Sequence, residues 1–291
     1  ALNSWWVANS LGPYPALNYS SDPNYGPAYG ANFMSPNFLI NNDGNTMLGN
    51  PTSFSSAEQA AVNAIRKFSN GVFNKSYVDP SAGITNTPAD AQRLQTFISG
   101  LYGKLQNGQY NNPWGLGSVM NGDMYNVLFA EEIIAEFKPE LLVVNMQDVD
   151  IGHFNFSQYA NNLRKADYAA AHLWNMIQST PGMANDTVMV IVPEHGRNFN
   201  ANTSADAYGR LALDHTAPVD LVSGDQMARE IFCMVVGPPT VVKQGLVINT
   251  TEGESTEVVP AIANLLGFDN SIPLSAGIKN YNQCDIAQAF Y

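Results

Sequence analysis

The sequence has 291 residues, a length that can bury a substantial core and that fits one large α/β domain better than two small ones. Lys and Arg number 13 against 25 Asp and Glu, which gives a net charge of −12 and a field that repels polyanions. We therefore expect neither nucleic acid nor a membrane as a partner, and no apolar run approaches the roughly 18–20 residues that a membrane helix needs.

The first part of the chain, residues 1–120, is predicted to be a loop-rich and helical lead-in. Its expected elements, in chain order, are a short strand at residues 5–8, a long ordered loop rich in Pro, Gly, Asn and Tyr over 10–55, a helix over 57–68, and a helix that begins at Pro88 behind Thr87 as its cap. Both helices show a packing pattern, so we expect them to be structural.

Helices and strands alternate from residue 121 onward. The expected elements are a helix over 124–137, a strand over 141–146, a helix over 159–178, strands over 188–192 and 231–236, and a helix over 257–266. Such alternation is typical of a mostly parallel central sheet flanked by helices. We predict a single α/β domain over residues 1–291, with its core in 121–291.

The two cysteines and the glycosylation-like triplets bear on the compartment of the protein. Cys233 lies within an apolar run, which predicts a buried small hydrophobe, while a disulfide to Cys284 is the alternative role. Sparse lysine and six Asn-x-Ser/Thr triplets favour an extracytoplasmic location, periplasmic or secreted.

Three of the four histidines lie just past strand-like runs and close to carboxylates. The three turns are Gln147–His153, which contains Asp148 and Asp150, then Glu194–His195, and then Asp214–His215. Because strand ends of a parallel sheet face one crevice, these turns can converge, and carboxylate with imidazole makes a site for a divalent metal such as zinc. The alternative for each single turn is a solvated loop. His172 falls inside an amphipathic helical pattern, so we expect it to pack or to lie on the surface.

Several of these segments resemble one family. Residues 185–196, which end in Pro193-Glu194-His195-Gly196, are similar to the segment of the alkaline phosphatase and sulfatase superfamily in which Asp-His-Gly follows a buried strand. Asp214-His215-Thr216 resembles the last metal histidine of that superfamily, residues 229–238 its strand ending in Gly-Pro, and residues 257–267 its closing helix. The resemblance covers residues from about 140 to 268, with the motifs in the same order.

The resemblance implies an alkaline-phosphatase-like fold and a metal-dependent hydrolase that acts on a small anionic phosphate or sulfate ester. Two ions would bridge the reacting group. The implied ligands are Asp150, His153 and His215 for one ion, and Glu194 and His195 as part of the set for the other. The expected metal is zinc, with magnesium, manganese or calcium as alternatives.

The chain also departs from the family pattern. Asp148 is an alternative to Asp150 as the ligand, Glu194 replaces the usual Asp, and Arg197 is a candidate catalytic anion clamp or an exposed arginine. The family's first strand, with its metal-binding Asp and its nucleophile, has no counterpart before residue 140. We therefore expect a hydrolase that is complete only with an upstream segment. The alternatives are a degenerate noncatalytic member that acts as a structural or binding domain of an exported assembly, and an oligosaccharide-binding module.

Overall fold

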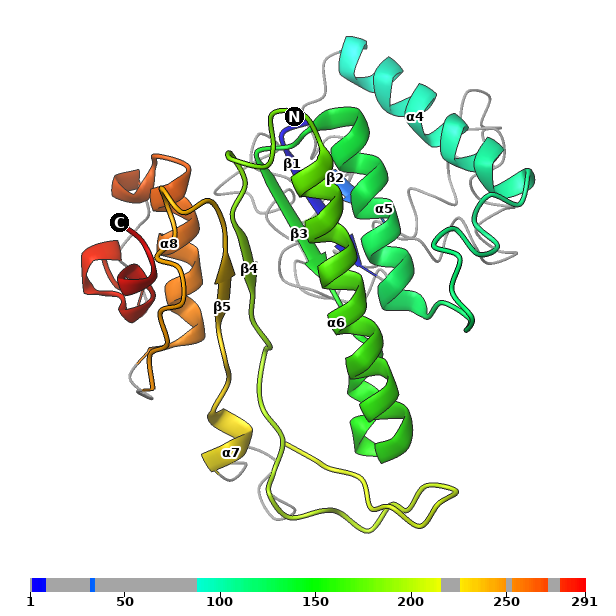
Figure 1. Cartoon of the computed structure of the whole chain (residues 1–291), viewed down its shortest axis with the longest axis vertical. Coiled ribbons are helices and arrows are strands. Elements are labelled where there is room, and N and C mark those ends of the chain that lie inside the picture. The colour runs from blue at the N-terminus through cyan, green and yellow to red at the C-terminus, as the bar shows by residue number, and fades with distance from the viewer. Residues whose placement is uncertain (1, 9–31, 35–87, 216–225, 250–252, 272–277) are drawn as a thin grey trace, which may run out of the picture. The chain divides into compact units, whose positions relative to one another are not determined.

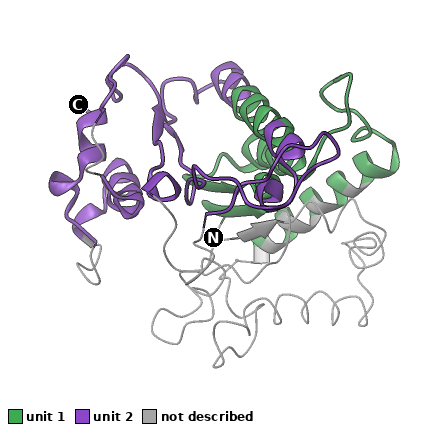
Figure 2. Cartoon of the chain, turned by 90° about the horizontal axis from the view of Figure 1, so that it is seen from below, with its two compact units in different colours: residues 1–149, 161–173 green, residues 150–160, 174–291 purple. Residues whose placement is uncertain are grey.

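The computed structural model of the chain describes residues 2–8, 32–34, 88–215, 226–249, 253–271 and 278–291 (Figure 1). The chain mixes helices and strands and forms two compact units, of which unit 1 comprises residues 1–149 and 161–173, and unit 2 comprises residues 150–160 and 174–291 (Figure 2). The helix expected over 57–68, the capping residue Thr87 and most of the loop expected over 10–55 lie outside the described residues. The expectation of a single domain stays a prediction.

Unit 1 contains a small parallel sheet of three strands. The strands are β1 (Ser4–Ala8), β2 (Asn32–Met34) and β3 (Leu141–Asn145), in the order β2-β1-β3, with Trp5 of β1 opposite Asn32 and Leu142. The two strands predicted at residues 5–8 and 141–146 are therefore present. β2 falls in the stretch predicted as loop, because three residues are too few to show the alternation that identifies a strand.

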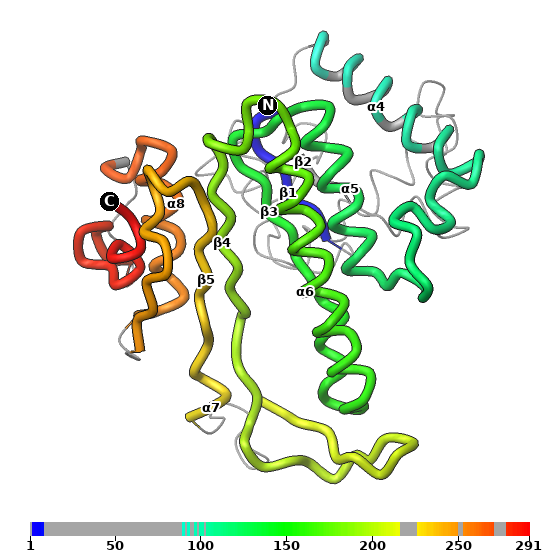
Figure 3. Tube along the Cα trace, in the orientation of Figure 1, coloured from blue at the N-terminus to red at the C-terminus, as the bar shows by residue number. Residues whose placement is uncertain are grey.

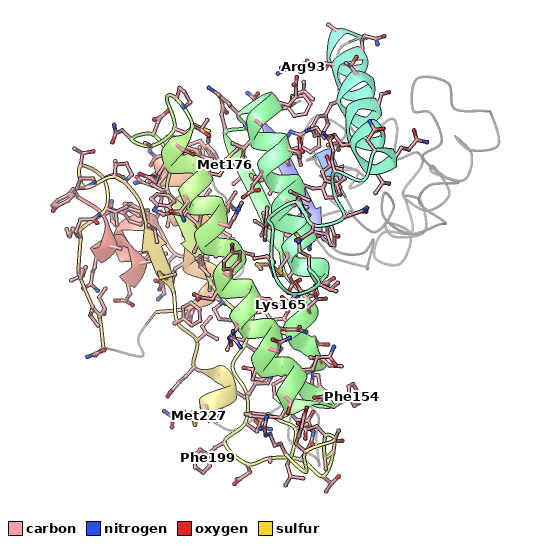
Figure 4. The ribbon with its side chains drawn as sticks, turned by 45° about the vertical axis from the view of Figure 1, so that its right-hand side comes forward. Arg93, Phe154, Lys165, Met176, Phe199 and Met227 are labelled. Atoms are coloured by element: carbon pink, nitrogen blue, oxygen red, sulfur yellow. The ribbon has the colours of Figure 1, made fainter. Side chains whose placement is uncertain are left out.

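Aromatic side chains form the core where the helices of unit 1 meet the sheet. Helices α4 (Pro88–Gln106) and α5 (Gly122–Phe137) contribute Phe97 and Phe137, and α5 packs on β1 and β3. Trp5 stacks on Phe137 at 5.1 Å between ring centroids, and Phe97 meets Phe137 edge-on at 4.9 Å. Arg93, labelled in Figure 4, joins α4 to α5 through a 2.8 Å ion pair with Glu136. The aromatic part of the core of unit 1 thus joins β1, α4 and α5.

Two carboxylates connect the start of α5 to the end of β3. The fully buried Asp123 accepts hydrogen bonds from the backbone N–H groups of Gln147 (2.6 Å) and Asp148 (3.0 Å). In return, the carboxylate of Asp148 accepts from the N–H of Asp123 at 3.0 Å. Helix N-termini leave N–H groups without partners inside the helix, so a carboxylate is stabilising there.

Helix α6 (Phe156–Ser179) begins three residues before its predicted start. Asn155 caps it, since its side chain accepts from the N–H of Gln158 at 2.9 Å. His172, on the part of α6 that belongs to unit 1, contacts Glu131 through Nδ1 at 2.6 Å and stacks on Trp114 at 4.2 Å. The packing role predicted for His172 is therefore confirmed.

Unit 2 contains a two-stranded sheet of a different kind. Strands β4 (Met189–Ile191) and β5 (Met234–Val236) are antiparallel, with Met189 opposite Val236 (Figure 3). The predicted parallel pairing is thus found in the sheet of unit 1 and not in this pair.

Cys233 lies just before β5, which begins only at Met234, and its side chain is exposed. The prediction that Cys233 is buried was therefore wrong. Both cysteines are free, and the alternative of a disulfide to Cys284 is not realised.

The carboxyl-terminal part of unit 2 is built from short helices. They are α7 (Gln226–Arg229), α8 (Val258–Leu265) and the 3₁₀ helices η5 (Ser255–Glu257), η6 (Asp269–Ser271), η7 (Tyr281–Gln283) and η8 (Asp285–Ala289). Val242, Ala261 and Phe290 form the buried cluster here. The buried carboxylate of Glu257 contacts Lys279 Nζ at 2.6 Å and accepts from the N–H of Asp285 at 2.7 Å. Burial raises the pKa of Glu257, but the hydrogen bonds from Lys279 and the backbone outweigh it and lower the pKa overall.

We predict that Lys279→Met lowers the free energy of unfolding near pH 7 by more than the control variant below, because it leaves the buried Glu257 carboxylate without its cation. The wild-type contribution is present above the ordinary carboxyl pKa of about 4.3 and is lost as the pH falls through the lower folded pKa. The difference between wild type and variant should therefore shrink in acid. Urea unfolding at several pH values measures it. Lys243→Met, which removes a bond to the backbone carbonyl of Gln288, is the matched control, and an equal effect in both variants would contradict the prediction.

Candidate functional site

Three histidine rings lie together in unit 2. His195 and His215 are stacked, with ring centroids 3.8 Å apart and planes inclined at 29°. His153 meets His215 edge-on at 4.9 Å and 65°. The three turns that the sequence singled out therefore converge, although His153 and His195 are 42 positions apart in the sequence.

Backbone hydrogen bonds hold the turns in place. His153 ends the 3₁₀ helix η4 (Asp148–His153), directly before Phe154, which precedes the cap of α6 (Figure 4), and His195 follows β4. The bonds between turns run from Leu213 N to Gly152 O (2.9 Å), from Asn198 N to Asp214 O (2.7 Å) and from Gly196 N to Ala228 O (2.8 Å). The rings are thus presented by a fixed backbone.

The imidazole of His153 lies between two carboxylates. Its Nδ1 contacts Oδ1 of Asp214 at 2.5 Å, and its Nε2 lies 3.3 Å from Oδ1 of Asp150. A carboxylate oxygen accepts here, so Nδ1 carries a proton that it donates to Asp214, the nearer of the two carboxylates. Nε2 is the ring atom that faces Asp150.

His195 repeats this arrangement with a different acceptor. Its Nδ1 donates to the backbone carbonyl of Gly196 at 2.7 Å, and its Nε2 lies 3.0 Å from Oε1 of Glu194. Histidines that bind metals commonly donate one ring N–H to a carboxylate or a carbonyl, which fixes the other nitrogen as the ligand. Both histidines therefore donate through Nδ1 and place Nε2 beside a carboxylate.

The electrostatics of the cluster favour a neutral His215 and an ionised Asp214. Burial, followed by the nearby positive charges of His195, His153 and Arg197, lowers the pKa of His215. The hydrogen bond with His153 is the main cause that lowers the pKa of Asp214, and the bond from Asn202 adds to it. Neutral imidazole and ionised carboxylate are the forms that coordinate metals.

Arg197 lies beside the cluster rather than in solvent. Its side chain is only 11% exposed, its Nη2 is 3.4 Å from Oδ1 of Asp150, and its guanidinium lies 5.7 Å from the centre of the Tyr159 ring. Nη1 donates to the carbonyl of Leu213 at 3.3 Å. The alternative of an exposed surface arginine was therefore wrong, because Tyr159 and the turn at Gly152 cover the side chain.

One donor pair of the cluster has the spacing of zinc ligands. Two ligands about 2.0–2.1 Å from a tetrahedral zinc lie about 3.3–3.4 Å from each other, which is the separation of His153 Nε2 and Asp150 Oδ1, whereas His195 Nε2 and Glu194 Oε1 are 3.0 Å apart. Within the described ranges, no three His, Cys, Asp or Glu side chains are arranged to hold one ion together. The side chains of Asp150 and Glu194 are 66% and 82% exposed. Asp148, the alternative ligand, has its carboxylate at the start of α5 in unit 1.

Two residues of the cluster were not identified from the sequence. Asp214 was noted only as the neighbour of His215, and its adjacency to a histidine was the available signal. Asn202 donates to both Asp214 and the carbonyl of His153, and it gave no signal beyond an Asn-x-Ser triplet.

Comparison of the chain with protein-family models, with curated proteins and with solved structures found no match. Of the helices that the structure describes, none has the length and apolar character to cross a membrane.

We predict that Gly196→Ala destabilises the protein by about 1–3 kcal/mol, because a Cβ at this position would lie 2.1 Å from the carbonyl oxygen of Met227 and 2.7 Å from that of Glu230. Backbone atoms cannot move aside as a flexible side chain can. Urea unfolding measures the change. Gly117→Ala is the control, since nothing lies within 4 Å of its added Cβ, and equal stability of the two variants would disprove the clash.

Proposed function

We propose that this chain carries the metal site of a hydrolase of phosphate or sulfate esters, with an alkaline-phosphatase-like fold. The observation that supports the proposal most is the repeated geometry of His153 and His195, in which Nδ1 is tied to an acceptor and Nε2 faces a carboxylate. Such a nitrogen and the carboxylate beside it could both serve as ligands of one ion.

The proposed ligands keep the roles that the family resemblance implies. Asp150, His153 and His215 hold one divalent ion, zinc in the first place, and Glu194 and His195 contribute to a second. A bound divalent ion neutralises charge that develops on a phosphoryl or sulfuryl oxygen. The attacking group comes from a segment outside this cluster.

Arg197 is the proposed clamp for an oxygen of the ester anion. Its Nη2 already lies at a carboxylate oxygen, Asp150 Oδ1, and the planar guanidinium can donate to phosphate and sulfate oxygens in the same way. In a chain of net charge −12, such local positive charge is needed before a small anion can bind.

A noncatalytic binding or structural domain is the second candidate. It is favoured by one observation, that within the described residues no three donors are arranged to hold one ion. The two candidates differ in a measurable way, because the hydrolase requires a tightly bound metal that in turn binds phosphate.

We predict that the protein binds zinc near pH 7 and that His153→Ala and His195→Ala each weaken the affinity by about a hundredfold or more, since even the outer partners of metal ligands are worth 10- to 100-fold. Isothermal titration with zinc measures this. His172→Ala is the matched control, because His172 contacts Glu131 and Trp114 instead. A wild type that binds no zinc, or a loss as large in the control, would overturn the proposal in favour of the noncatalytic domain.

A second test concerns the anion. We predict that inorganic phosphate binds the zinc-loaded protein but not the metal-free protein, and that Arg197→Met weakens phosphate binding by about tenfold or more, the equivalent of one charge-assisted hydrogen bond. Arg197→Lys should lose less, because it keeps the charge. Arg210→Met is the control, since Arg210 contacts Ser157 and Tyr208. Phosphate binding that depends neither on the metal nor on Arg197 would contradict the ester hydrolase.

A further inference from the structure

The side chain of Asn202 makes three hydrogen bonds at and beside the histidine cluster. Its Nδ2 donates to the backbone carbonyl of His153 at 3.0 Å and to Oδ2 of Asp214 at 2.9 Å. Its Oδ1 accepts from the N–H of Ser204 at 2.8 Å. The orientation of the amide is therefore determined, because a flipped amide would place oxygen against two acceptors and nitrogen against a donor.

Asp214 links Asn202 to the ring of His153. One carboxylate oxygen accepts from Asn202 and the other contacts Nδ1 of His153 at 2.5 Å. A carboxylate held at one oxygen cannot rotate freely, so the other oxygen stays aimed at the imidazole. The three side chains form one continuous path that ends at Nε2 of His153, beside Asp150.

The loop that carries Asn202 is itself anchored. The N–H of Asn202 donates to the carbonyl of Ala212, and the N–H of Ala212 donates to Ser204, both at 2.8 Å. Asp206, in the same loop, accepts from the N–H of Ser157 near the start of α6 at 3.0 Å, and it also bonds the hydroxyl of Ser157. The position of Asn202 is thus set by the backbone on both sides.

We propose that Asn202 is a positioning residue that acts through Asp214 to keep the proton of His153 on Nδ1 and its Nε2 directed at the metal position. The proton on Nδ1 is assigned from the 2.5 Å contact with Asp214. Its consequence for metal affinity rests on the proposed function. The same contacts give the Asn202-Thr203-Ser204 triplet a role other than glycosylation, since a glycan on Nδ2 would replace one of the two donated hydrogens.

The proposal is tested by the imidazole ¹H–¹⁵N spectrum of ¹⁵N-labelled protein without metal, combined with zinc titration. In the wild type, His153 should show a protected, downfield Nδ1–H resonance. In Asn202→Ala this resonance should exchange faster, and zinc affinity should fall by about tenfold. Asp214→Asn keeps the shape but can present an N–H to the ring, so it should remove the Nδ1–H resonance altogether.

Asn112→Ala is the matched control, because Asn112 also makes two loop hydrogen bonds, to the N–H and the carbonyl of Leu116. It should leave both the His153 resonance and the zinc affinity unchanged. A His153 resonance that is the same in Asn202→Ala, Asp214→Asn and wild type overturns the positioning role. If the wild type binds no zinc but the resonance responds as expected, the proposed function fails and the positioning role stands.

Discussion

The 2.5 Å hydrogen bond between Asp214 and Nδ1 of His153 is the contact on which the arrangement of the candidate site depends, and it joins residues 61 positions apart. Because it occupies Nδ1, it determines that Nε2 faces Asp150. It also brings His215, the next residue in the chain, to the edge of the His153 ring and against His195. Without it, the backbone contact between Leu213 and Gly152 would remain, but the His153 ring would lose the side-chain contact that orients it.

Several carboxylates of the described residues are held by backbone N–H groups, in a chain where 25 acidic residues share 13 basic ones. Asp123 accepts from two N–H groups after β3, and Glu257 combines Lys279 with the N–H of Asp285. Asp206 accepts from Ser157, Tyr208 and Arg210, and the bond from the Ser157 side chain is the main cause that lowers its pKa to about 2. Turns and helix starts offer N–H groups that bind anions, so they substitute for scarce cations.

The sequence predicted well what depends on long periodic patterns and poorly what depends on pairing. Helices α5 and α6 were located to within three residues, since 16 and 24 residues of pattern average out local exceptions. β2 and the antiparallel direction of the β4–β5 pair were missed, because three-residue strands carry no information on direction. The convergence of His153, His195 and His215 was expected from their places after strands, whereas Asp214 and Asn202 act through contacts that only the folded loop creates.

The charges around the three histidines imply an order of binding in the proposed function. Three carboxylates, those of Asp150, Glu194 and Asp214, gather here beside one guanidinium, that of Arg197. The lowered pKa of His215, caused first by burial, means that this ring does not supply a compensating charge near neutral pH. An ester anion therefore meets repulsion from the cluster until a divalent ion occupies the donor pairs. In the proposed function, the metal is therefore expected to bind before the anion, and the side chains of Asp150 and Glu194, 66% and 82% exposed, are accessible to the ion.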